Sequence, residues 1–249
     1  MTLLMQWPQV IVVVLAMLNL GINIAHHGKT KEVTFNGWHR LATVIIWGTL
    51  LWFGGFFKEA HAQTTPSIPS AAAKHRADLT RTAHSQWGLD APVATFAAQL
   101  HQESGWQPQA LSRVGAAGMA QFMPATARWW CQINGLSDAD CQPNNPTWAL
   151  RALVGYNKWL HDRVAADDGC NRMAFVLSAY NGGLGWVQRD KALAKNNRLN
   201  PAIWFDQVER VNAGRSAANW RENRDYPRRI LHRLEPAYKA AGWGRGACP

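Results

Sequence analysis

Hydrophobic and polar positions divide the chain into an apolar beginning and a longer amphipathic part. Residues 8–24 and 41–57 are two apolar runs without a charged side chain. A helix needs about 20 mostly apolar residues to cross a bilayer, with a lower limit near 17. We therefore expect two transmembrane helices within residues 1–62. The alternative, a pair of core helices in a soluble protein, accounts less well for two uncharged runs followed by a polar linker.

Charges around these runs predict their orientation. The loop between them carries Lys29, Lys31 and Arg40, whereas only Lys58 closely follows the second run. Basic residues favour the cytoplasmic side of a membrane. The loop is therefore expected in the cytoplasm, with both chain ends facing outward. In a bacterium with two membranes, this places the larger part of the chain in the periplasm, anchored to the inner membrane.

A polar segment separates the apolar beginning from the rest. Residues 63–75 are rich in Pro, Ser, Thr and Ala without periodicity, which predicts a linker. Residues 60–62 read Ala-His-Ala, a pattern like a signal-peptidase site. Cleavage after Ala62 would release the remainder, and the alternative is that residues 1–62 stay attached as an anchor. Either way, residues 76–249 are expected to form one exported domain.

Residues 76–249 show hydrophobic residues at helical spacing. The clearest stretches are 90–104, 147–164, 171–180 and 226–241, whereas strand signals are few and short. In the first stretch, Asp90 is expected to cap a helix that has Pro92 in its first turn. The pattern predicts an all-α domain.

The charge and the cysteines narrow the environment of this domain. Residues 63–249 carry 22 Lys and Arg against 14 Asp and Glu, most of the formal net charge of +10. Such a domain suits an anionic polymer, and the chain has no zinc-finger, RNA-binding or basic-zipper pattern that would indicate nucleic acid. Four cysteines permit two disulfides in three pairings, and the short separation makes Cys131–Cys141 the first expectation.

Glu103 is the most unusual charge in the domain. It lies one helical turn from Leu100, beside the apolar stripe, and Ser104 and Gly105 follow it. Apolar surroundings disfavour a charged carboxylate and raise the pKa of the group, as a general acid requires. Ser104 is placed to orient the carboxyl, and Gly105 to end the helix. The alternative is an ordinary glutamate at the edge of an amphipathic helix, with its carboxylate in water.

Three further stretches carry unusual residues in a fixed order. Residues 112–127 contain two glycines three apart, followed by Met119 and Gln121. Residues 178–183 place Tyr180 and Asn181 at the expected end of a helix, and Tyr226 stands at the expected start of another.

These residues resemble the soluble-lytic-transglycosylase (SLT, goose-type-lysozyme-like) family over about residues 76–240. The motifs that match are Glu103-Ser104, Gly118-Met119-Ala120-Gln121 for the family's G-L-M-Q, Ala179-Tyr180-Asn181, and the later Tyr226. Ala120 departs from the family, which has Met there. The resemblance implies a lysozyme-like α-helical fold, no metal or other cofactor, and cleavage of peptidoglycan between N-acetylmuramic acid and N-acetylglucosamine with a 1,6-anhydromuramic product.

The resemblance also implies residue roles and leaves alternatives. Glu103 would be the catalytic acid and base, and the substrate-binding residues would be Ser104, Met119, Gln121, Tyr180, Asn181 and Tyr226. The two apolar runs look like a small phage holin, which suggests a phage or prophage lysis enzyme. The alternatives are a muramidase that uses water, and a non-enzymatic membrane protein whose domain only binds glycan. Trp106 and Trp186 are expected to pack in the core rather than stack on sugar, and no oligomeric state is predicted.

Overall fold

The computed structural model describes residues 66–249, and the expected transmembrane runs, their loop and the first three residues of the linker lie outside these residues. Among the residues described, no helix is both long and apolar enough to span a bilayer. The end of the expected linker is ordered instead of irregular. Residues Ser70–His75 form a short 3-10 helix, η1, and Ala72 and His75 within it are buried.

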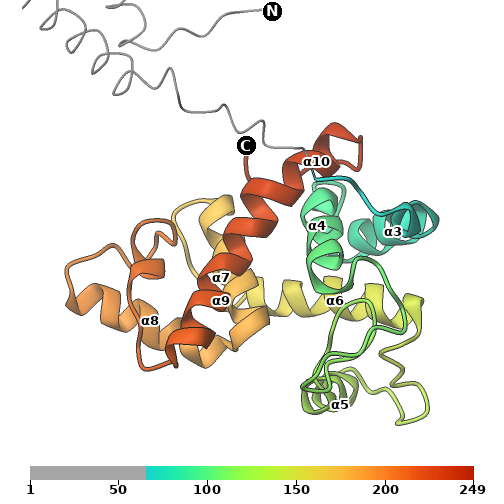
Figure 1. Ribbon diagram of the computed structural model, residues 1–249, viewed down its shortest axis with the longest axis horizontal. Coiled ribbons are helices and arrows are strands. Elements are labelled where there is room, and N and C mark those ends of the chain that lie inside the picture. Colours follow the sequence, from blue (N-terminus) through green and yellow to red (C-terminus); the bar gives the residue numbers. More distant parts are fainter. Residues whose placement is uncertain (1–65) are drawn as a thin grey trace, which may run out of the picture. The chain divides into compact units, whose positions relative to one another are not determined.

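Helices dominate residues 66–249, which confirms the all-α class for this part of the chain (Figure 1). After η1 they are α3 (Arg76–Trp87), α4 (Val93–Ser104), α5 (Pro124–Ile133), α6 (Pro146–His161), α7 (Gly169–Gly182), α8 (Leu184–Asn196), η2 (Val208–Arg210), α9 (Ala217–Arg228), η3 (Arg229–Leu234, a π-helix) and α10 (Glu235–Ala240). Extended pairing in this part is limited to two isolated bridges, Leu111 with Ala117 and Ala117 with Phe122.

Helix α4 is central to the core. Every residue from Val93 to Leu100 is buried, because α3, η3 and α10 all pack against this helix. Most of these residues are apolar, and the two polar ones, Thr95 and Gln99, have hydrogen-bond partners inside the core. Figure 1 shows α4 beside α10, with α3 on its other flank. This burial fixes the position of the end of α4, where Glu103 stands.

Two helix starts differ from the expectation. Asp90 does not cap α4, since its carboxylate pairs with Arg245, and Pro92 takes the cap position. The last stretch begins at Ala217 rather than near residue 226, and α9, η3 and α10 follow one another without a break (Figure 1). Tyr226 therefore lies in the third turn of α9. Residues 217–225 are so polar that the pattern conceals a helix, although Asn223 is buried there.

Two disulfides and a buried carboxylate stabilise the fold of residues 66–249. Disulfides join Cys131 to Cys141, as expected, and Cys170 to Cys248. The buried carboxylate of Glu235 accepts hydrogen bonds from the Thr95 hydroxyl and from the backbone N–H of Cys248 at 3.1 Å. The C-terminal tail is thereby held against α4 and α10.

Candidate active site

The end of α4 places Glu103 at a helix terminus. Gly105 adopts a left-handed conformation with φ of 58°, and its N–H donates to the carbonyl of His101 at 3.0 Å. Glycine is favoured there because it has no Cβ to clash in this conformation. The prediction that Gly105 ends the helix is confirmed, and Glu103 lies in its last turn.

Tyr226 is the residue that contacts the Glu103 carboxyl. Its phenol, on the buried face of α9, donates a hydrogen bond to Oε1 of Glu103. Ser104 was expected to do this, but its hydroxyl donates to the Met119 carbonyl at 2.9 Å and accepts from the Gln107 N–H at 3.1 Å. Ser104 therefore joins the end of α4 to the loop that contains Met119, and orientation of Glu103 comes from α9.

The surroundings favour the protonated form of Glu103. Burial is the main cause and raises the pKa of its carboxyl to about 8. The hydrogen bond from Tyr226 opposes this rise, while the negative charge of Glu222 adds to it. A carboxyl with such a pKa holds its proton at neutral pH, as the sequence analysis predicted.

The two tyrosines near Glu103 stay protonated. Burial and then the Glu103 charge raise the pKa of both Tyr180 and Tyr226 well above the ordinary value for a phenol. Tyr180 donates its hydroxyl hydrogen to the Ala120 carbonyl at 2.8 Å. The end of α7 is thus tied to the same loop that Ser104 holds.

This loop, residues 110–123, is closely packed, and Met119 has a different place from the one expected. Its side chain is fully buried in the core, so it supports the site from below instead of presenting a surface to substrate. Gly118 has φ of 76°, and a Cβ added there would lie 1.8 Å from the Pro143 carbonyl oxygen. Glycine is required at this position because the two backbones touch.

Gln121 is held by the same loop. Its φ of 49° is unusual for a residue with a side chain, and its amide nitrogen donates to the carbonyls of Gly118 at 2.9 Å and Ala110 at 3.2 Å. These bonds use the nitrogen end of the amide, which fixes the direction of its oxygen. The side chain remains partly exposed.

Asn181 belongs to a neighbouring polar group. Its amide nitrogen donates to Glu222 at 3.3 Å, and its oxygen accepts from the Asn223 amide at 2.9 Å. Asn223 is itself buried and bonded to Ser178 of α7. The structure therefore brings Glu103, Tyr180 and Tyr226 together, sets Ser104, Met119 and Gln121 along one loop, and places Asn181 beside Glu222.

Two site residues were missed from the sequence. Gln99 lies one turn before Glu103 on α4, is fully buried, and accepts a hydrogen bond from Asn157 of α6 at 2.7 Å. Its amide approaches the Tyr226 phenol and partly opposes the rise in the pKa of that phenol. Gln99 and Asn157 each lie within the apolar stripe of their helix. That position was a visible signal, because a polar side chain that is buried among apolar ones needs a hydrogen-bond partner.

Trp106 takes the core position that was expected for it. The side chain is fully buried, and its indole N–H donates to the Tyr238 hydroxyl at 2.7 Å. Trp186 lies elsewhere, beneath the guanidinium groups of Arg189 and Arg215, at 3.8 Å and 5.1 Å from its ring centre. In residues 66–249, no three His, Cys, Asp or Glu side chains gather closely enough to hold a metal ion.

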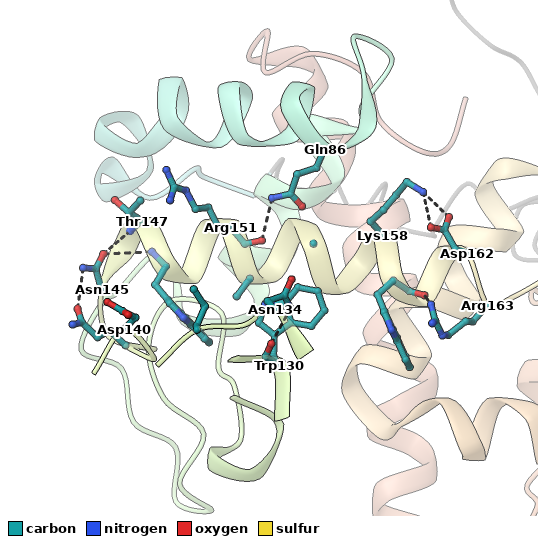
Figure 2. A pocket seen from close by; sticks show the side chains of 16 residues that line it. Gln86, Trp130, Asn134, Asp140, Asn145, Thr147, Arg151, Lys158, Asp162 and Arg163 are labelled. Carbon is teal, nitrogen blue, oxygen red and sulfur yellow. Dashed lines mark hydrogen bonds and ion pairs between the residues drawn. The ribbon is translucent and has the colours of Figure 1, made fainter. Parts of the chain in front are cut away.

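Of the hollows in the described part of the chain, one lies away from this site and another adjoins it. One of about 840 Å³ runs along α6 between α3 and α5, lined by Trp130, Arg151 and Lys158 among others, and does not include Glu103 (Figure 2). The other, of about 360 Å³, includes Asn181 and Glu222 and so adjoins the site.

Comparison with known proteins agrees with these motifs. The family model of the transglycosylase SLT domain matches residues 78–203. The membrane-bound lytic murein transglycosylase F of Alcanivorax borkumensis is 32% identical over 135 residues, which are 54% of this chain and 27% of that protein. The protein of the same name from Yersinia pestis is 31% identical over 159 residues, or 62% of this chain and 28% of that protein. The chain thus spans little more than a quarter of these relatives.

Solved structures share the fold. An inactive mutant of the lytic transglycosylase Slt from Pseudomonas aeruginosa aligns with a TM-score of 0.55 and 24% identity, over 84% of this chain and 31% of that one. The 70 kDa soluble lytic transglycosylase of Escherichia coli aligns with a TM-score of 0.51 and 20% identity, over 84% and 30%. The matched residues 78–203 include Glu103, Gln121 and Asn181, and the fold supplies Tyr226 from beyond them. The chain belongs to the transglycosylase SLT domain family.

Proposed function

We propose that this chain is a membrane-anchored lytic transglycosylase that cleaves the β-1,4 bond between N-acetylmuramic acid and N-acetylglucosamine in peptidoglycan. The observation that carries the proposal is the Glu103 carboxyl, which burial keeps protonated at neutral pH and which Tyr226 orients. Its place in the family's first motif supports this role.

One carboxyl can serve both halves of the reaction. Glu103 first donates its proton to the glycosidic oxygen as the bond from that oxygen to C1 of the muramic sugar breaks. The resulting carboxylate then takes the proton of the muramic 6-hydroxyl, whose oxygen bonds to C1 and closes the 1,6-anhydro ring. No water enters the product, and Glu103 ends protonated as it began.

A glycosidase that uses water commonly needs a second carboxylate near the bond. Among the described residues, Glu222 is the acid whose charge raises the pKa of Glu103, and it is exposed and bonded to Asn181. Its contact with Asn181 supports a role in shaping the site. Because Glu222 is exposed and bonded to Asn181, we assign it no role as a second catalytic carboxylate. In the proposed mechanism the N-acetyl group of the muramic sugar stabilises the positive charge on C1.

The remaining site residues would position the sugar. Gln121 has a fixed amide oxygen that can accept from the N-acetyl N–H, since its nitrogen is already bonded within the loop. Tyr180, Asn181 and Tyr226 would hold the sugar ring, Tyr226 through the carboxyl to which it is bonded. Ser104 and Met119 would act indirectly, because Ser104 bonds to the backbone of the loop that carries Gln121 and the Met119 side chain is buried beneath that loop.

The cellular place is part of the proposal. Residues 8–24 and 41–57 would anchor the chain in the inner membrane, with the catalytic domain in the periplasm, unless cleavage after Ala62 releases it. Two disulfides support an oxidising compartment, and the similar proteins named above are called membrane-bound. The linker would end at η1 rather than at residue 75. The holin-like beginning favours a phage or prophage lysis role.

Digestion of purified peptidoglycan by the detergent-solubilised full chain tests this function. Mass spectrometry should find anhydromuropeptides with the wild-type protein and none with Glu103→Gln. Asp225→Asn is the matched control, because Asp225 is an exposed acid one residue from Tyr226. Products with a reducing muramic end would show a hydrolase, and intact peptidoglycan under all conditions would favour a binding or membrane role.

A further inference from the structure

The 360 Å³ hollow beside the site is built around a buried arginine. Its walls come from the end of α7, the start of α8, the 214–216 turn and α9; the lining residues are Asn181, Gly182, Trp186, Gly214, Arg215, Ser216, Asn219, Glu222 and Asn223. Asn181 and Glu222 connect it to the catalytic carboxyl, since the Glu222 charge acts on the pKa of Glu103. A substrate bound at Glu103 can therefore reach this hollow.

Arg215 has an unused hydrogen-bond donor here. The side chain is buried, with an exposed fraction of 4%. Its Nη1 pairs with the fully buried carboxylate of Asp190, whereas Nη2 has no partner among the described residues although it is buried. Buried polar groups are normally bonded, so an unpaired guanidinium N–H in a hollow marks a place for an acceptor.

The charge around Arg215 is also incomplete. Asp190 pairs with Arg224 as well, at 2.8 Å, so one buried carboxylate faces two guanidinium groups. Arg224 directs its remaining donors to Asn223 and to backbone carbonyls, and Arg215 does not. A negatively charged acceptor would balance this excess, and guanidinium binds carboxylates strongly.

The backbone keeps Arg215 in place beside the hollow. The Asn212 side chain accepts from the Arg215 N–H at 2.8 Å and from Gly214 at 3.1 Å, which fixes the turn. Gly182 lies over the guanidinium, where a single added Cβ would come within 3.4 Å of Nη2. A side chain at residue 182 would press on Nη2, which is itself buried, so glycine gives this donor the most room that the wall allows.

Glu222 adds an acceptor at the rim of the hollow. It is exposed, and beyond Asn181 it has capacity to accept further N–H groups. A guanidinium and a carboxylate that line one hollow suit a peptide, which carries both a carboxylate and amide N–H groups. A bare anion would use the guanidinium alone.

We infer that this hollow binds a carboxylate of the stem peptide attached to the muramic sugar, with Arg215 Nη2 as its donor. The inference rests on the proposed function, because the peptide is part of the peptidoglycan substrate. The lactyl group of the muramic sugar is the other source of a carboxylate. It becomes free only when the peptide is removed, so the two sources can be separated.

Binding to the inactive full chain carrying Glu103→Gln tests this inference by calorimetry with three probes. The first is glycan fragments with stem peptides, the second is the same fragments with peptides removed, and the third is N-acetylglucosamine oligomers, which have no carboxylate. Adding Arg215→Gln should weaken the affinity for the peptide-bearing fragments by about 10-fold or more, because a charged hydrogen bond is lost. The affinities for the other two probes should not change.

Controls separate binding from folding. Arg215→Lys should retain the pair with Asp190 but lose the second donor, and should give the same selective loss if Arg215→Gln fails to fold. Arg210→Gln, an exposed arginine paired with Asp206, should change none of the three affinities.

Three results would overturn the inference. A loss on the fragments with peptides removed would assign the donor to the lactyl carboxylate, which is free only there, and losses on all three probes would indicate general damage to the glycan site. Unchanged affinities with both Arg215 variants would show that the hollow binds no carboxylate. Failure of the wild-type chain to cleave peptidoglycan would instead count against the proposed function. The two failures are distinguishable, because the affinities are measured with an inactive variant and do not depend on cleavage.

Discussion

The phenol of Tyr226 donates a hydrogen bond to Oε1 of Glu103, which joins α9 to the end of α4 across 123 positions of sequence. This bond works against the burial that raises the pKa of Glu103. It therefore orients the carboxyl and limits the rise, so that the group can both give and accept a proton near neutral pH.

Tyr226→Phe should raise the pKa of Glu103 above about 8, because the bond that stabilises the carboxylate is lost. We expect kcat to fall about 10-fold or more and the alkaline limb of the pH–rate profile to move to higher pH. Tyr238→Phe removes the same hydroxyl from a core tyrosine bonded to Trp106, and should lower stability without moving the limb. A limb that moves to lower pH in Tyr226→Phe would contradict this account of the bond.

Activity of the wild-type chain should decline as the pH rises through about 8. Glu103 must be protonated because it donates a proton to the glycosidic oxygen, which then leaves as a neutral hydroxyl. The carboxyl loses its proton as the pH rises through about 8. Measurement of kcat/KM on glycan fragments between about pH 5 and pH 10 checks this. Activity that increases through pH 8 would mean that another group supplies the proton.

Glu103→Gln should stabilise the fold at alkaline pH. The carboxyl has a higher pKa in the folded chain, about 8, than the ordinary 4.5, so the folded state binds the proton more tightly between these values. Wild-type stability therefore falls as the pH rises from about 4.5 to 8, and the neutral amide removes this loss. The variant's advantage should grow across that window to the order of a few kcal/mol and then level off.

Denaturant unfolding at acidic and alkaline pH measures this difference. Asp225→Asn removes an exposed carboxylate of α9 and serves as the control for the loss of one surface charge. A constant difference between Glu103→Gln and the wild type at every pH would contradict the raised pKa.

Gly118→Ala should be more damaging than Gly115→Ala. Both glycines have positive φ, so both substitutions strain the backbone. Only at Gly118 would the new Cβ meet a neighbour, the Pro143 carbonyl oxygen, whereas nothing lies within 4 Å at Gly115. We expect Gly118→Ala to cost roughly 2–4 kcal/mol and Gly115→Ala about 1 kcal/mol, measured by thermal unfolding. Equal costs would show that the loop can move away from Pro143.

Local features of this site could be predicted from the sequence. The position of Glu103 beside the apolar stripe, the end of α4 at Gly105 and the Cys131–Cys141 pair depend on residues close together in the chain. Periodicity and spacing contain that information directly.

Contacts between distant segments could not be predicted in this way. Ser104 bonds to Met119 rather than to Glu103, Met119 is buried, and Tyr226 lies inside a helix whose polar first turns conceal it. Each depends on how α4, α9 and the loop meet, which pattern alone does not specify. The unpaired donor of Arg215 is visible only once Asp190 and its partners are placed.

The origin of the oxygen at the new muramic end tests the central claim most directly. Peptidoglycan is digested by the full chain in water enriched with heavy oxygen, and the released muropeptides are weighed. If Glu103 activates the muramic 6-hydroxyl, the products lack one water relative to hydrolysis products, carry no heavy oxygen, and are absent with Glu103→Gln. Heavy oxygen at C1 of the muramic sugar would show that water is the nucleophile and would contradict the proposed reaction.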